Sequence, residues 1–190
     1  MRMSIVLLVI MSGCLGGGPD VEAEPTTTTI TLPEDCGLDV PVRLQMDGDW
    51  CGVAVSQMIL EYYGLYADQK TLSEEIVGDR GGSLTHMKDV LAGYGLEVEE
   101  KNYGLEGVSE LEKAVCGERS PVIVLQRMGF ENPNSHYRIV AGFDRRYAYV
   151  IDPYYGRVRF TRNEFRELWE FNDPNRVDNT ALIVRGGVRV

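Results

Sequence analysis

Basic residues and histidines are scarce in this chain, and closely spaced cysteine pairs are absent. Each of these shortages makes one class of function less expected. Its 19 Lys and Arg are outnumbered by 29 Asp and Glu, which gives a formal net charge of −10 over 190 residues. Because such a surface repels phosphate backbones, nucleic acid is not an expected partner. Only two histidines are present, so a catalytic base of that type has few candidates. No Cys-x-x-Cys pair of the kind common in zinc sites occurs.

The N-terminal apolar run, Ile5–Met11, is also short. A helix needs about 20 apolar residues to span a bilayer, so this run instead predicts a secretory signal peptide over residues 1–13. Arg2 precedes the run, and the stretch MSGC that ends it resembles a lipobox, in which the cysteine is lipidated. We therefore expect Cys14 to anchor an extracytoplasmic lipoprotein to the cell-surface membrane. Cleavage of an ordinary secretory signal nearby is the alternative.

Residues 14–35 are rich in Gly, Pro and Thr and include the run TTTT. Such a composition buries too little apolar surface to fold, which predicts a surface tether. The remaining residues, 36–190, are enough for one compact domain, and no internal repeat is visible in them.

Two further cysteines, Cys36 and Cys116, lie inside the predicted domain. Outside the cytoplasm such leftover thiols often pair, and a bridge here would pin the point where the tether enters the domain. Two buried free thiols are equally compatible with the sequence, because a disulfide needs the two Cα atoms within about 4.4–6.8 Å.

Hydrophobic periodicity, helix caps and glycines divide the domain into helices and strands. Helices are predicted at Asp49–Tyr63, Ser83–Gly95 and Asn163–Phe171, with capping boxes of the type Ser/Thr-x-x-Glu at Thr71, Ser109 and Thr161. Strands are predicted at Glu97–Tyr103, Pro121–Met128, His136–Phe143, Tyr147–Ile151, Arg157–Phe160 and Thr180–Arg185. Since the helices come mostly first and the strands later, the pattern is α+β, with N-terminal helices on a C-terminal antiparallel sheet.

Cys51 is the candidate nucleophile, because it opens the first predicted helix. The positive end of a helix lowers the pKa of a thiol and favours the reactive thiolate. Gly52 follows it and would leave room for a substrate, while Gln45 lies six residues before it. A backbone N–H and an amide side chain placed there could together bind a developing oxyanion.

A cysteine nucleophile also needs a base. His136 opens one predicted strand, and Asp152 ends the next strand after a short turn. Antiparallel neighbours bring these positions to the same edge of the sheet, where a carboxylate can orient the imidazole. His86 is the competing histidine, but it lies within a predicted helix without an acidic partner, as expected for a solvated surface residue.

Each of these residues also has a reading without catalysis. A cysteine at a helix start is often structural, and an Asp-Pro after a strand is often only a turn. Cys51, His136 and Asp152 could together bind zinc, although they lack paired-ligand spacing. We expect no metal and no other cofactor.

Two stretches of sequence favour the catalytic reading. QMDGDWCGVAVSQMILEYYG and SHYRIVAGFDRRYAYVIDPYYG resemble the two signature blocks of the papain-like bacteriocin-processing cysteine peptidases, the C39 family, and in particular its C39-like branch outside exporters. The resemblance spans about Val40–Val184 and implies a papain-like fold. It also implies that Cys51 is the nucleophile, His136 the base, Asp152 the orienting acid and Gln45 the oxyanion residue.

The chain departs from the family pattern at Val53, where Pro is frequent, and at Ser56, where a small or apolar residue is usual. Trp50 before the cysteine suits the C39-like branch better than the exporter peptidases. We therefore expect cleavage of peptide bonds in a peptide or protein substrate, without assuming the double-glycine specificity of the exporters. Acyl transfer to another amine, and a non-catalytic binding module with the same fold, are the alternatives.

Overall fold

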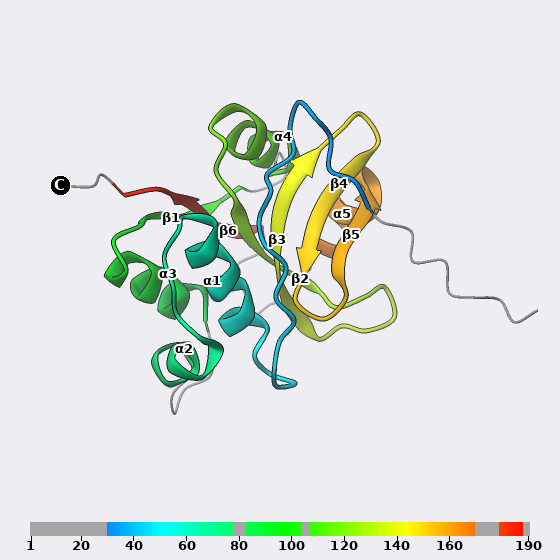
Figure 1. Ribbon diagram of the computed structural model, residues 1–190. Helices are drawn as coiled ribbons and strands as arrows, with labels where there is room; N and C mark the ends of the chain where they lie inside the picture. The colour runs from blue at the N-terminus through cyan, green and yellow to red at the C-terminus, as the bar shows by residue number, and fades with distance from the viewer. Residues whose placement is uncertain (1–29, 78–82, 104–106, 170–178, 188–190) are drawn as a thin grey trace, which may run out of the picture.

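The computed structural model describes residues 30–77, 83–103, 107–169 and 179–187 (Figure 1). The predicted signal peptide, Cys14 and the Thr run lie outside the described residues. Within the described part of the chain, no helix is long and apolar enough to cross a membrane.

The core of the fold is one antiparallel sheet of six strands in the order β1-β6-β2-β3-β4-β5. The strands are β1 (Glu97–Asn102), β2 (Val122–Arg127), β3 (Ser135–Phe143), β4 (Tyr147–Asp152), β5 (Gly156–Thr161) and β6 (Thr180–Arg185). All six agree with the predicted strands to within a few residues. From His136 onward every residue of the central strand β3 is buried, whereas the edge strand β1 is mostly exposed.

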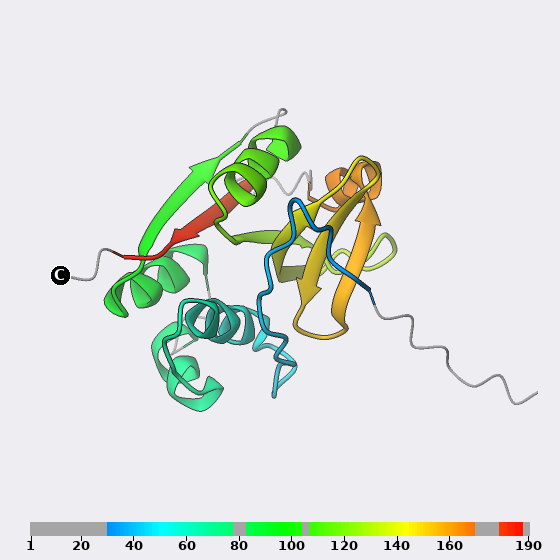
Figure 2. The same ribbon diagram turned by 45° about the horizontal axis from the view of Figure 1, so that its top comes forward.

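The helices gather in two places around the sheet (Figures 1 and 2). Their bounds are α1 (Cys51–Tyr62), α2 (Gln69–Ile76), α3 (Leu84–Gly93), α4 (Gly107–Glu112) with the π-turn η3 (Lys113–Gly117), and α5 (Arg162–Trp169). The first three helices pack together on one side, where α1 contacts β3 and α3 contacts β1. Helix α5 packs against β2, β4 and β5. The predicted α+β architecture, with helices packed on an antiparallel sheet, is thus confirmed.

Only one of the three predicted capping boxes forms. Thr161 Oγ1 accepts from the Glu164 N–H at 3.2 Å, and Glu164 Oε2 accepts from the Thr161 N–H at 2.7 Å. The prediction at Thr71 is wrong, because the carboxylate of Asp68 caps α2 instead by accepting from the Thr71 N–H at 3.0 Å. The prediction at Ser109 is also wrong, because α4 already begins at Gly107. At Thr71, a Thr three residues before Glu does not define the helix start, because the stronger Asp68 cap precedes it.

The leading segment, residues 36–50, precedes α1 in the chain and lies against the sheet before it enters that helix. It runs beside β3 (Figure 1), with the Leu38 N–H donating to the Ala141 carbonyl at 2.7 Å. Farther along, the Gln45 N–H donates to the Pro153 carbonyl at 2.8 Å, just beyond β4. Gly142 permits this close approach, since a Cβ there would lie 2.9 Å from the Cys36 carbonyl oxygen.

Cys36 and Cys116 form a disulfide across a sequence separation of 80 residues, with their Cα atoms 4.7 Å apart. Of the two arrangements that the sequence left open, the structure therefore has the paired one. The bond fastens the beginning of the leading segment to η3, and Leu38 and Val40 then bury their side chains completely in the core. The entry of the chain into the domain is thus fixed by covalent and apolar contacts.

Candidate active site

Cys51 is the first residue of α1 and is the free cysteine of the described part of the chain. Trp50 at the N-cap makes no side-chain hydrogen bond to the helix end, and the first turn of α1 carries no acidic residue. The positive end of the helix dipole therefore remains available to the sulfur, which favours the thiolate.

His136 and Asp152 meet at the edge predicted from the sequence. The His136 Nε2 atom lies 3.1 Å from Asp152 Oδ1, and both residues are almost fully buried, with exposures of 3% and 1%. The other ring nitrogen, Nδ1, is left for Cys51, and the two side chains are close enough to shift each other's pKa. The structure thus links Cys51, His136 and Asp152 in one chain of contacts.

The surroundings shift the pKa values of all three groups. Burial alone would raise the pKa of the Cys51 thiol, but the hydrogen bond from His136 and the Tyr137 N–H bring it below its ordinary value. Burial would likewise lower the pKa of His136, yet its bonds to Asp152 and Cys51 raise it. Both pKa shifts act toward the thiolate and the imidazolium, the protonation states that a nucleophilic pair requires.

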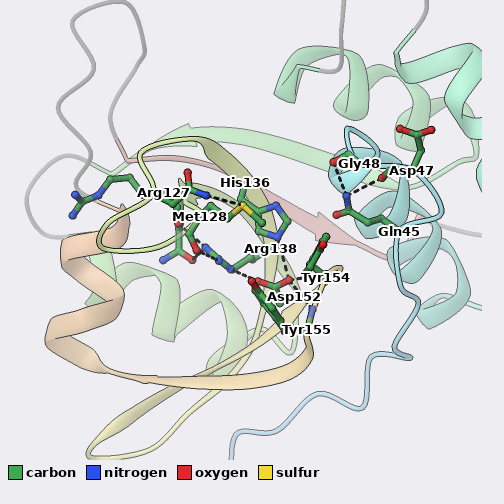
Figure 3. A network of polar contacts seen from close by, with 12 residues as sticks. Gln45, Asp47, Gly48, Arg127, Met128, His136, Arg138, Asp152, Tyr154 and Tyr155 are labelled. Atoms are coloured by element: carbon green, nitrogen blue, oxygen red, sulfur yellow. Dashed lines mark hydrogen bonds and ion pairs between the residues drawn. The ribbon is translucent and has the colours of Figure 1, made fainter.

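Asp152 is held ionised despite its burial. Burial raises the pKa of a carboxyl group, but the hydrogen bond from His136 and the charge of Arg138 lower that of Asp152 to about 2. Its Oδ1 atom also accepts from the backbone N–H groups of Tyr154 and Tyr155, at 2.7 and 3.1 Å. The turn after β4 therefore fixes the carboxylate that contacts the histidine (Figure 3).

Arg138 is a site residue that the sequence analysis missed. It lies two residues after His136 on β3, so both side chains project from the same face of the strand. Its Nε donates to Asp152 Oδ2 at 2.7 Å, and the side chain is only 1% exposed. A signal was present in the sequence. Arg138 stands in the predicted strand HYRIVAGF, directly before its apolar run IVAGF, and an arginine in such a buried strand needs a buried partner.

Cys51 and His136 lie in the wall of a cavity of about 470 Å³. Apolar side chains from α1, the end of α2 and β2 share this wall with polar groups, and the full lining is Gln45, Gly48, Asp49, Cys51, Gly52, Val53, Ile76, Val77, Leu125, Met128, Asn134, Ser135, His136 and Tyr137. A cavity of this size can hold a short stretch of peptide beside the sulfur.

Gln45 lines the cavity, but its amide group is engaged within its own loop. The Nε2 atom donates to the carbonyls of Asp47 and Gly48 at 2.8 and 2.7 Å, while the buried Oε1 atom has no hydrogen-bond partner. Figure 3 shows Gln45 with these two carbonyls, apart from the group around Asp152. To donate to an oxyanion, Nε2 must give up one of its two loop carbonyls.

Gly52 lines the cavity beside Cys51, and it also has a packing role that was not expected. A Cβ at this position would lie 3.1 Å from the Met87 sulfur and 3.3 Å from the Tyr137 ring, both of which belong to neighbouring elements of the core. Glycine here lets α1 pack closely against β3, and it thereby brings Cys51 toward His136.

The second histidine and the metal alternative do not enter this site. His86 lies on α3, partly exposed, and is not part of the cavity wall. Its backbone N–H donates to the Ser83 cap at 3.2 Å. Among the residues that the structure describes, no group of three or more His, Cys, Asp or Glu side chains could hold a metal ion.

Comparison with known proteins places this geometry in a family context. Residues 37–174 match the model of the Peptidase_C39 like family. A comparison with curated proteins gave no match.

Several solved structures share the fold. One is a double glycine motif protease from an AMS/PCAT transporter, solved with the leader peptide; it is 24% identical, with a TM-score of 0.61 over 83% of this chain and 99% of the other. A putative C39-like peptidase from Bacillus anthracis is 17% identical, with a TM-score of 0.63 over 80% and 98%. The peptidase domain of Streptococcus ComA is 18% identical, with a TM-score of 0.60 over 77% and 98%. At these identities the likeness establishes the shared papain-like fold.

Proposed function

The chain belongs to the Peptidase_C39 like family, and on that premise we propose that it is a cysteine peptidase whose catalytic residues are Cys51, His136 and Asp152. One observation carries the proposal. Cys51 and His136 lie together in the wall of a cavity of about 470 Å³, and the Nε2 atom of His136 contacts the buried Asp152 carboxylate at 3.1 Å. This is the order of contacts that a nucleophile, a base and an orienting group require.

In the proposed reaction, the Cys51 thiolate attacks the carbonyl carbon of a peptide bond. The carbonyl electron pair moves to oxygen, and the C–N bond breaks when the His136 imidazolium gives its Nδ1 proton to the leaving amine. A thioester then joins the substrate to Cys51. His136 next removes a proton from water, which attacks the thioester and releases the carboxylic acid and the thiolate.

The oxyanion of each tetrahedral intermediate needs hydrogen-bond donors close to Cys51. We assign this role to the Cys51 backbone N–H at the start of α1 and to Gln45, which lines the same cavity. Gln45 would exchange its bond to the Asp47 or the Gly48 carbonyl for one to the substrate. Because catalytic hydrogen bonds often form fully only with substrate bound, the resting contacts of Gln45 are compatible with this exchange.

The proposed substrate is a peptide or an extended protein segment. One of the similar structures is a protease in complex with a leader peptide. In this chain the cavity lies beside the Cys51 sulfur and combines apolar side chains with polar groups, as peptide sites do.

We place the proposed enzyme outside the cytoplasm, tethered through Cys14. The apolar run and the MSGC stretch support this location. The Cys36–Cys116 disulfide supports it as well, because such bonds persist in oxidising compartments. Incorporation of a labelled fatty acid into the wild-type chain, and its loss in Cys14→Ser, would test the anchor.

The peptidase proposal is tested by incubating the full chain with a peptide library and identifying the products by mass spectrometry. Cys51→Ala and His136→Ala are expected to lower cleavage by about 10⁴-fold or more. His86→Ala is the matched control, since it removes the other histidine without touching the cavity wall, and it should cleave like the wild type. Cleavage that persists in Cys51→Ala would refute the proposal.

The same assay separates the two alternative functions. With a competing amine added, a transferase would yield a product that carries this amine, whereas a hydrolase would yield mainly the free acid. A binding module would release no product, and its Cys51 would react with a thiol-directed peptide probe no faster in the wild type than in His136→Ala.

A further inference from the structure

Arg138 occupies an unusual place, because the central strand of the sheet is otherwise apolar around it. The side chain is 1% exposed and lies on β3 between His136 and the buried Val140. Moving a guanidinium from water into such a site costs several kcal/mol unless charged and polar partners replace the water. The partners of Arg138 therefore indicate why a charge is kept there.

The guanidinium joins two parts of the sheet beside the site, the end of β4 and the end of β2. Its Nε donates to Asp152 Oδ2 on β4 at 2.7 Å. Its Nη1 donates to the Arg127 carbonyl at 2.8 Å and to Gln126 Oε1 at 3.4 Å. Its Nη2 donates to the Met128 carbonyl at 2.8 Å. Arg138 thus ties the carboxylate to the end of β2, where Met128 enters the cavity wall (Figure 3).

Resting on the function proposed above, we propose that Arg138 is a positioning residue for the reaction: its guanidinium holds Asp152 ionised and directed at His136, and it neutralises the buried charges of the working site. Asp152 Oδ1 faces His136 and also accepts from two backbone N–H groups of the turn after β4, while Oδ2 faces Arg138. With Oδ2 taken, the carboxylate cannot turn away from the imidazole without breaking a buried ion pair.

Counting the charges shows what Arg138 adds. In the reactive state Cys51 and Asp152 are negative, while His136 and Arg138 are positive, so the four groups sum to zero. Without Arg138 the same buried cluster would carry one net negative charge, which favours uptake of a proton. That proton would go to the Cys51 thiolate or to the Asp152 carboxylate, and in either place it would weaken the nucleophile.

The neighbouring elements bring no further charge to the cluster. From β5, Phe160 places its ring centroid 5.6 Å from the guanidinium carbon. From α5, the Phe165 carbonyl accepts from the Gln126 amide at 3.1 Å. The Arg127 side chain pairs with Glu167 at the surface, 3.8 Å away. Among the described residues, the titratable groups that act on Asp152 are therefore His136 and Arg138, with Cys51 acting through His136.

The test measures how the reactivity of Cys51 depends on pH, and it requires neither substrate nor turnover. The full chain is treated with iodoacetamide at a series of pH values from about 3 to about 10, spaced about one unit apart. Alkylation of the Cys51 peptide is followed by mass spectrometry. Arg138→Met removes the charge but keeps a long apolar side chain. Arg138→Lys restores the charge without the fork of donors. The matched control is Arg162→Met, which breaks a two-bond ion pair with Glu112 far from Cys51.

Arg138→Met is expected to move the acid edge of the alkylation profile upward by about one pH unit or more. Arg138→Lys should have an edge closer to that of the wild type, and Arg162→Met should leave the edge unchanged. A folded Arg138→Met with the wild-type edge would overturn the proposal. So would an Arg138→Lys profile that coincides with that of Arg138→Met.

If Arg138→Met does not fold, the variant Arg138→Met with Asp152→Asn decides the question. The proposal expects this double variant to be more stable than Arg138→Met alone, because no buried carboxylate is left without its cation. If the second substitution restores no stability, Arg138 serves only to bind the Arg127 and Met128 carbonyls, and the proposal is refuted.

The result is separable from that of the peptidase proposal. A shifted acid edge in a chain that cleaves no peptide would support the role of Arg138 and refute the peptidase. Peptide cleavage by the wild type, together with an acid edge that is unshifted in Arg138→Met, would support the peptidase and refute the role of Arg138. His136→Ala, assayed alongside, reports whether the thiolate depends on the imidazole at all.

Discussion

The two sides of the cavity are built in opposite ways. On the sheet side, His136, Arg138 and Asp152 are 3%, 1% and 1% exposed, and each is held by more than one polar contact. On the side of the leading segment, Leu44 and Met46 are 58% and 75% exposed, and the side chain of Gln45 between them bonds only to carbonyls of its own loop. The His136 imidazole and the Asp152 carboxylate are therefore held in place before any substrate arrives, whereas the Gln45 side chain has freedom to adjust.

Two ion pairs of equal length test this contrast most strongly. Arg138–Asp152 is buried and Arg157–Asp39 is at the surface, yet both have an N···O distance of 2.7 Å. Asp152→Asn should destabilise the fold by about 3–5 kcal/mol, because it leaves a buried guanidinium without its counter-ion. Asp39→Asn should cost less than about 1 kcal/mol. Urea unfolding measures both, and equal losses would contradict the contrast.

Gln45 tests the other side of the cavity. Gln45→Ala is expected to lower kcat by about 10²–10³-fold, as the loss of one oxyanion donor does, with little change in stability. The stability should hold because water can replace the amide at the two loop carbonyls. Steady-state kinetics on a cleaved library peptide, together with thermal unfolding, separates the effects. Met46→Ala, an exposed neighbour, should retain activity, and an unchanged kcat in Gln45→Ala would remove Gln45 from the chemistry.

Acid should weaken the sheet side selectively. The pKa of Asp152 is lowered from 3.8 to about 2 in the folded chain. Its contribution to stability is therefore fully present above pH 3.8 and is lost as the pH falls through about 2. The difference in unfolding free energy between wild type and Asp152→Asn should shrink by about 2 kcal/mol over this range. A difference that stays constant would show that the carboxylate is not stabilised by ionisation.

The smallest effect is expected at Gln69, which holds the loop on both sides of Gln45. Its Nε2 donates to the Leu44 carbonyl at 2.9 Å, and its Oε1 accepts from the Met46 N–H at 3.0 Å. Gln69→Ala should lower kcat several-fold, about 1 kcal/mol in barrier, because the loop loses its tie to α2. Ser73→Ala on the same helix is the control and should be silent. A loss as large as that of Gln45→Ala would mean that the loop is as rigid as the sheet side.

The sequence was most informative where a local pattern has one physical solution. Alternating apolar residues placed the strands, and the short turn between His136 and Asp152 brought these residues to one edge of the sheet. It was less informative where two caps compete. Asp68 and Thr71 can both begin a helix, and only the packed structure shows that the Asp68 carboxylate takes the free N–H.

The partners of Arg138 and the direction of the Gln45 amide were unpredictable for a different reason. The partners of Arg138 come from β2 and β4, so its role depends on contacts between strands that no single stretch of sequence contains. The direction of the Gln45 amide depends on the path of the loop from Asp47 to Gly48, which periodicity does not describe.

The Cys36–Cys116 bond has a mechanical consequence for a domain held by its N-terminal end. A pull on the chain before Cys36 reaches the covalent link to η3 before it reaches the residues that lead to Gln45 and Cys51. The force is therefore transmitted through the disulfide to η3, and the segment from Cys36 to α1 is not stretched. The bond would thus let the N-terminal attachment bear a force while the distances between Gln45, Cys51 and His136 stay the same.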